Sequence, residues 1–102
     1  MAGKLRIDAP HVVTAGAPFD CVVRIQGALA GDTVRIRLRQ TAGVQPLYDQ
    51  TEAATIDHLG GGTARYLTAV LNGPCVARLV ADDVESVQPL AQDDDHIQVV
   101  AP

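Results

Sequence analysis

The stretch over residues 19–39 constrains the fold more than any other part of the chain. Its second half alternates strictly, with Val34, Ile36 and Leu38 separated by arginines. Successive side chains of a β-strand point to opposite faces of the sheet, so the apolar side chains share one face and the arginines share the other. A helix would mix the two kinds around its circumference. The pattern therefore predicts a β-strand over residues 33–40.

A second strand is predicted just before it, over residues 19–26, where Cys21, Val23 and Ile25 share one face. Two strands that each have one apolar face need a second layer of structure to bury those faces. A later segment, residues 75–82, alternates in the same way. The predicted core joins the inward side chains of these strands: Val34, Ile36, Leu38, Cys21, Val23 and Leu79.

The rest of the chain continues this pattern of short strands and turns. Residues 4–8 alternate, Pro10 interrupts them and residues 11–14 resume, which is typical of a strand at a sheet edge. Residues 41–52 are the least regular, because Gly43 and Pro46 break them. Further strands are predicted at 47–48, 53–58, 63–71 and 97–100, turns at 15–18, 60–62 and 72–73, and a polar loop at 83–95.

Seven or eight short strands with turn signals between them, and no segment of helical period, predict an all-β fold. The spacing of strands and turns is that of two antiparallel sheets packed face to face. We therefore expect a β-sandwich that forms one domain over residues 1–102.

Composition excludes several classes of partner. The net charge is −4 and aromatic residues make up only 3%, so neither a basic surface nor a stacking platform for nucleic acid is expected. No apolar run approaches the roughly 20 residues that a membrane helix needs. The first residues have no apolar signal core, so nothing in them directs the chain to secretion.

The strand layout resembles that of an immunoglobulin-like sandwich, with residues 19–26, 33–40 and 75–82 in the positions of the family's strands B, C and F. The resemblance covers nearly the whole chain. There is no tryptophan, and Gly73 stands where antibody-type domains have the tyrosine of the tyrosine corner. The better comparison is therefore with bacterial and viral immunoglobulin-like modules. A fibronectin-type or another Greek-key sandwich is the alternative.

The resemblance places Cys21 and Cys75 at the family's two inter-sheet cysteine positions, and alternation turns both inward. It implies a disulfide, which would stabilise the fold by roughly 4 kcal/mol on the chain-entropy account. The alternative is a pair of buried free thiols that act as small hydrophobic side chains. The sequence leaves both interpretations open, and it predicts no catalytic role for either cysteine, since each lies inside an apolar strand.

The remaining polar residues do not assemble a catalytic motif in the sequence. His11, His58 and His96 are scattered, without the close spacing of a metal-binding pair. Ser86 lacks the flanking glycines of a nucleophile elbow, and the glycines at 60–62 lack the Lys-Ser/Thr of a phosphate loop. The acidic triplet over 93–95 hints at a cation site, but a solvated acidic loop is the preferred interpretation. We expect no enzyme activity, cofactor or metal.

The arginines are the most informative polar residues. If the strands at 33–40 and 75–82 are neighbours, as the immunoglobulin-like layout has them, four arginines share one outer sheet face: Arg35, Arg37, Arg39 and Arg78. We prefer the interpretation that they form local charge pairs on a solvated sheet, each worth little. The alternative is a basic face that docks on an acidic partner.

We expect a non-enzymatic structural or interaction protein. The resemblance to the decoration and accessory proteins of tailed phages implies folding in the bacterial cytoplasm and binding to a capsid or tail surface on the virion. This inference is by analogy of fold. The alternative is an immunoglobulin-like module of a larger cell-surface protein that binds carbohydrate, calcium or protein. The sequence leaves the partner, the oligomeric state and the completeness of the chain open.

Overall fold

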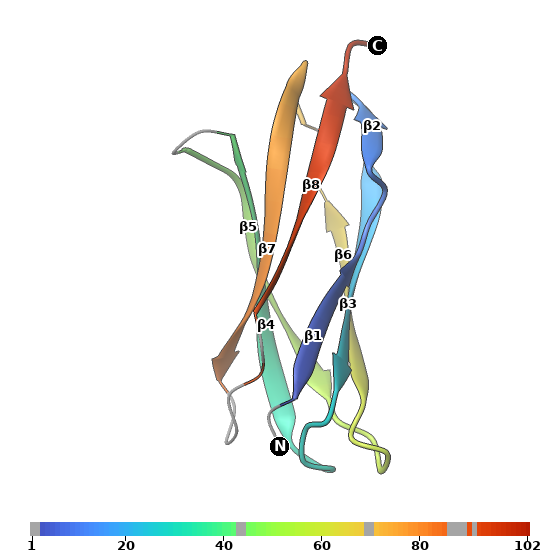
Figure 1. Cartoon of the computed structure of the whole chain (residues 1–102), viewed down its shortest axis with the longest axis vertical. Helices are drawn as coiled ribbons and strands as arrows, with labels where there is room; N and C mark the ends of the chain where they lie inside the picture. Colours follow the sequence, from blue (N-terminus) through green and yellow to red (C-terminus); the bar gives the residue numbers. More distant parts are fainter. Residues whose placement is uncertain (1–2, 43–44, 69–70, 86–89, 91) are drawn as a thin grey trace.

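The computed structural model describes residues 3–42, 45–68, 71–85, 90 and 92–102 (Figure 1). This part of the chain is all-β, with eight strands and no helix. The strands are β1 (Lys4–Asp8), β2 (Val12–Thr14), β3 (Phe19–Gln26), β4 (Thr33–Ala42), β5 (Gln45–Thr55), β6 (Gly62–Thr68), β7 (Cys75–Glu85) and β8 (Asp93–Val100). Among the described residues there is no helix that is long and apolar enough to cross a membrane.

The eight strands form two sheets, as predicted. One sheet has three strands in the order β1-β3-β6, and the other has five in the order β2-β8-β7-β4-β5. Neighbouring strands are antiparallel except β2, which runs parallel to β8. Figure 1 shows the sheets as two layers along the long axis of the molecule.

The N-terminal segment contributes an edge strand to both sheets. β1 is at one edge of the three-stranded sheet, and β2 is at one edge of the five-stranded sheet. The residues between them include Pro10, which has no N–H to donate to a ladder. The predicted edge position of this proline-interrupted segment is confirmed.

The core lies between the two sheets and contains the predicted side chains. Every one of the six predicted core residues is fully buried: Val34, Ile36, Leu38, Cys21, Val23 and Leu79. Tyr66 of β6 is the largest fully buried side chain, and its hydroxyl donates a hydrogen bond of 2.6 Å to the backbone carbonyl of Ile36 on β4. This bond ties the two sheets together through the core.

The prediction that residues 41–52 are irregular was wrong for most of that segment. β4 continues to Ala42, and β5 is a single strand of 11 residues that also takes in the first half of the short strand predicted at 53–58. The register between β4 and β5 shifts at Gln40/Thr41, opposite Pro46. A proline is tolerated there because β5 is an edge strand and the bulge interrupts the ladder. Gly43 and Val44 lie outside the described residues.

The predicted polar loop over 83–95 is shorter than expected. β7 continues to Glu85 and β8 already begins at Asp93, because the acidic side chains find donors on neighbouring strands. Residues 86–89 and 91 of the predicted loop, like residues 69–70 of the strand predicted at 63–71, lie outside the described residues.

The predicted turn at the glycine triplet is present and is closed by Asp57. Its carboxylate accepts hydrogen bonds from the backbone N–H groups of Leu59 (2.8 Å) and Gly61 (3.0 Å). The two bonds lower the pKa of Asp57, and the bond from Gly61 contributes most. Gly60 has a φ of +82°, which favours glycine at this position. Gly62 then begins β6.

Candidate interaction surface

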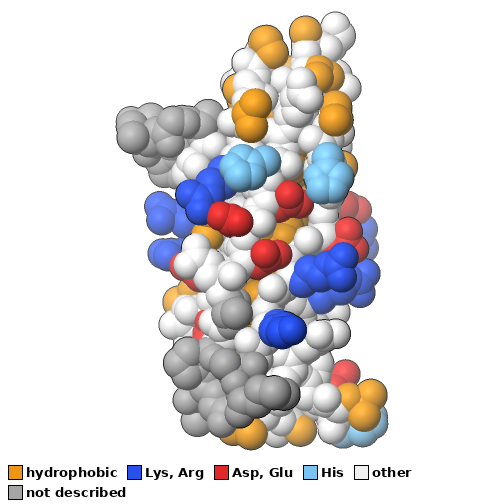
Figure 2. Space-filling model, in the orientation of Figure 1, with side chains coloured by type: hydrophobic (Ala, Val, Ile, Leu, Met, Phe, Trp, Pro, Cys, Tyr) orange, Lys and Arg blue, Asp and Glu red, His pale blue; other side chains and the backbone are white. Residues whose placement is uncertain are grey.

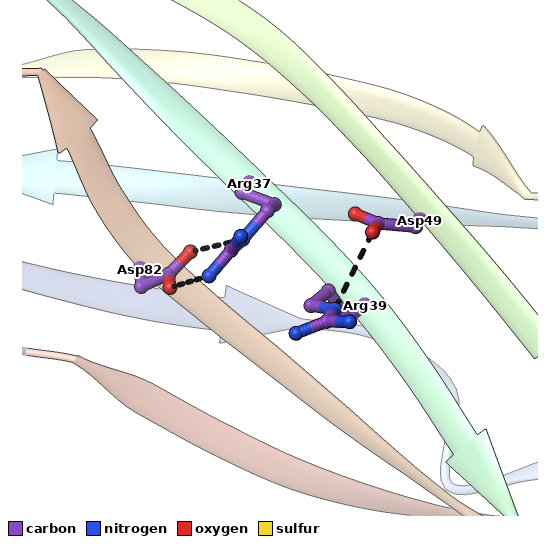
Figure 3. A network of polar contacts seen from close by, with 4 residues as sticks. All are labelled: Arg37, Arg39, Asp49 and Asp82. Atoms are coloured by element: carbon purple, nitrogen blue, oxygen red, sulfur yellow. Dashed lines mark hydrogen bonds and ion pairs between the residues drawn. The ribbon is translucent and has the colours of Figure 1, made fainter. Parts of the chain in front are cut away.

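The predicted arginine row lies on the outer face of the five-stranded sheet. β4 has β5 on one side and β7 on the other, and both neighbours bring acidic side chains to the row. Arg37 and Asp82 form two parallel hydrogen bonds, 3.2 Å from Nε to Oδ1 and 2.7 Å from Nη2 to Oδ2 (Figure 3). The carboxylate raises the pKa of Arg37. Because both side chains are partly covered, this pair is the best defined on the face.

The other three arginines of this face are also paired. Arg39 Nε lies 3.4 Å from Asp49 Oδ2 on β5, at ion-pair distance but without the alignment of a hydrogen bond (Figure 3). Arg35 Nε lies 3.1 Å from an oxygen of Glu85, and both side chains are more than half exposed.

Arg78 of β7 forms an ion pair with Asp94 of β8, and its Nε donates a hydrogen bond of 3.2 Å to Asp94 Oδ2. The face therefore holds four arginines and four acids in cross-strand pairs. Exposed pairs of this kind contribute little to stability. They do leave the row without free positive charge, as the preferred interpretation of local charge pairs expects.

The outer face of the three-stranded sheet carries a different arrangement. Two of its arginines are paired, Arg24 with Asp8 at 3.4 Å and Arg65 with Asp20 at 2.6 Å. Lys4 and Arg6 of β1 form no ion pair with any described residue. All twelve acidic and all eight basic side chains of the chain belong to described residues, so six of the eight cations are paired and these two are not.

Lys4 and Arg6 lie beside Arg24 rather than apart. In the β1–β3 register Arg6 is directly opposite Arg24, and Lys4 is opposite Gln26. The four side chains line one hollow together with Leu5 of β1 and Asp93 of β8. We call this group, Lys4, Arg6, Arg24 and Gln26, the β1–β3 cation cluster. Sequence reasoning missed it because the alternation of β1 shows which way these side chains point but not which acids are within reach.

A hydrogen bond joins the two sheets between β1 and β8. The N–H of Ile7 on β1 donates to Asp93 Oδ2 on β8 at 2.7 Å. Ile7 pairs with Val23 on β3, and Asp93 pairs with Ala81 on β7. Val23 and Ala81 therefore lie at similar heights in the two sheets.

This height relationship bears on the two cysteines, which are both free thiols in the structure. Cys21 precedes Val23 by two residues and Cys75 precedes Ala81 by six, while β3 and β7 run in the same direction (Figure 1). Counted through this bond, Cys75 lies about four residues along β7 from the position level with Cys21. Cys75 is half-buried, and its Sγ contacts the Asn72 carbonyl. We expect no bridge between them.

The three histidines lie at separate places. His11 Nδ1 is 3.9 Å from Asp95 Oδ1, His96 is exposed on β8 opposite Arg78, and His58 is exposed in the turn after β5. Within the described part of the chain, no three or more His, Cys, Asp or Glu side chains group as ligands for a metal ion. Ser86 lies outside the described residues.

Strand alternation separates the acidic triplet that hinted at a cation site. Asp93 accepts from the N–H of Ile7, Asp94 pairs with Arg78, and Asp95 accepts from the N–H of His96 at 2.8 Å. Each carboxylate thus serves a different neighbour. The triplet is part of β8, so the expected solvated loop was wrong here.

Comparison with protein-family models gave no match, and comparison with curated proteins gave no relative. The interpretation of this surface therefore rests on the fold and on its charges.

Proposed function

We propose that this chain is a non-enzymatic immunoglobulin-like module that acts by surface contact within a protein assembly. The strand order supports the immunoglobulin-like assignment. β1-β3-β6 correspond to strands A, B and E of such a module, and β8-β7-β4-β5 correspond to G, F, C and C′. β2 then corresponds to the part of the first strand that switches sheets and runs parallel to G.

One observation carries the proposal of surface contact. Both broad faces of the sandwich present charged side chains in cross-strand rows, and six ion pairs hold those rows in place. Figure 2 shows one side of the molecule, on which acidic and basic side chains alternate at mid-height. Charged groups that are already ordered lose less freedom when a partner binds, which favours complementary and specific contacts.

The proposed setting is a virion, with the module bound to a capsid or tail surface as decoration and accessory proteins of tailed phages are. A sandwich of 43 × 22 × 17 Å suits such a role, because its strands present broad faces for contact. The setting rests on the resemblance of the fold layout, and the mode of action rests on the charged faces.

Sedimentation tests the proposal. An epitope-tagged copy is expressed in the cells that encode the chain, and their particles are separated on a density gradient. We expect the tagged chain to travel with the particle fraction and to be released by salt, whereas a tagged unrelated domain of similar size stays at the top. A chain that stays at the top and turns over a small substrate when purified would contradict the proposal.

A further inference from the structure

The β1–β3 cation cluster is unusual for a chain of this charge. Acids outnumber lysines and arginines twelve to eight, and six cations have found an acidic partner. The two that have none in the described chain, Lys4 and Arg6, are two residues apart on the same edge strand and point to the same side. Because acids are in excess, Lys4 and Arg6 would each be expected to have an acidic partner.

The cluster also places like charges together. Arg6 is directly opposite Arg24 across the β1–β3 ladder, and like charges in this position destabilise a strand pair. Asp8 offsets the charge of Arg24 but not that of Arg6. Its carboxylate lies 3.4 Å from the Arg24 guanidinium, and both side chains are more than half exposed. An anion seated between Arg6 and Arg24 would remove the repulsion and gain two charge-assisted hydrogen bonds.

We propose that the β1–β3 cation cluster is the docking surface for an acidic segment of a partner protein. This deepens, and rests on, the proposed role in an assembly. The cluster offers the donors of one lysine, two arginines and the Gln26 amide around one hollow, which matches two or three carboxylates on neighbouring residues. Asp93 of β8 also lines the hollow and repels carboxylates, so the segment is expected to lie over β1 and β3.

An acidic protein segment fits this surface better than a nucleic acid does. The net charge of −4 repels a long polyanion, whereas a short acidic segment meets only the local cations. All three aromatic side chains, Phe19, Tyr48 and Tyr66, are buried or half-buried, so none presents a ring on which bases could stack.

The test uses the whole chain and two labelled peptides, one with paired glutamates and one with lysines in their place. A double variant, Lys4→Gln/Arg6→Gln, removes the unpaired cations. Its control, Arg35→Gln/Arg65→Gln, makes the same change in net charge at two exposed, paired arginines. Binding is followed by the amide shifts of the isotope-labelled protein at about 10 mM salt, where exposed charges are weakly screened.

We expect the glutamate peptide to shift the amide signals of β1 and of the end of β3 that holds Arg24 and Gln26. The lysine peptide should shift none of them. The double variant should bind about five- to tenfold more weakly, the control should bind like the parent, and binding should fall as salt rises. Equal loss in both variants would reduce the effect to net charge and overturn the proposal. A single-stranded oligonucleotide that binds the same amides more tightly would also overturn it.

The same variants separate this inference from the proposed function. If the chain sediments with particles and the double variant does so equally well, the docking surface is wrong while the role in an assembly stands. Loss of particle association in Arg35→Gln/Arg37→Gln/Arg39→Gln alone would move the contact to the outer face of the five-stranded sheet. If the parent chain does not associate with particles at all, the proposed function itself is contradicted, whichever surface is involved.

Discussion

The hydroxyl of Tyr66 on β6 donates a buried hydrogen bond of 2.6 Å to the backbone carbonyl of Ile36 on β4, so a side chain of one sheet is anchored to the backbone of the other. The Tyr66 side chain is fully buried. The bond is therefore shielded from water, and its loss removes a hydrogen bond from the core.

Tyr66→Phe should lower the free energy of unfolding by about 1–2 kcal/mol, because it deletes the donor and keeps the ring. Urea unfolding at neutral pH measures the change. Tyr48→Phe is the control, since Tyr48 is half-buried and its hydroxyl bonds to Gln50, two residues along the same strand. Equal losses in the two variants would contradict a special role for the inter-sheet bond.

Replacing Gln40 should stabilise the protein. Its side chain is fully buried, and neither its Oε1 nor its Nε2 has a hydrogen-bond partner in the described structure. A buried amide without partners costs free energy, so Gln40→Met, of similar length, should raise the free energy of unfolding by about 1 kcal/mol. Gln50→Met should do the opposite, because Gln50 bonds to Tyr48 and Glu52. A Gln40→Met variant that melts lower than the parent would refute this account.

The two cysteines should differ in reactivity and should not be bridged. Cys21 is fully buried, and burial, followed by the nearby charges of Asp8 and Asp95, raises the pKa of its thiol to about 12. Cys75 is half-buried at the start of β7. A thiol reagent such as dithionitrobenzoate should label only Cys75 in the folded protein and both in denaturant. If unreduced, denatured protein yields no thiol, a disulfide is present after all.

Stability should fall in alkaline solution. The pKa of Cys21 is raised from its ordinary 9.0 to about 12, and burial also raises the pKa of Tyr66. The folded state keeps these protons to higher pH than the unfolded state does. Their contribution is therefore complete below the unfolded pKa and is lost as the pH rises between about 9 and 12.

Urea titrations across that range measure the alkaline loss, and Cys21→Ala should flatten the curve. The variant loses some packing at every pH, so the slope and not the absolute stability is the readout. Parallel curves for parent and variant would show that the Cys21 thiol is not the source.

Sequence alternation was enough to predict much of the fold. β1, β3 and most of β4 and β7 lie where their alternating side chains place them, and Val34, Ile36 and Leu38 face the core as expected. The edge position of the segment around Pro10 also follows from the sequence, since a residue without an N–H fits poorly in the middle of a ladder. These features depend on each residue's own geometry and on its nearest neighbours.

The sequence could not predict which strands pair, in what register and at what height. Pro46 and the polar residues at 93–95 suggested loops, yet each lies in a strand because a partner strand accommodates it. The bond from Ile7 to Asp93 joins residues 86 positions apart and links the two sheets.

The candidate site divides in the same way. From the sequence alone, the arginines of β4 point outward together and form a candidate docking face. Only the tertiary structure shows that acids of β5, β7 and β8 pair with these arginines and with Arg78 of β7. Only the tertiary structure shows, too, that Lys4 and Arg6 have no acidic partner in the described chain. The physical reason is that alternation along a strand fixes the side on which a charge lies, whereas long-range pairing between strands decides which opposite charges come within reach.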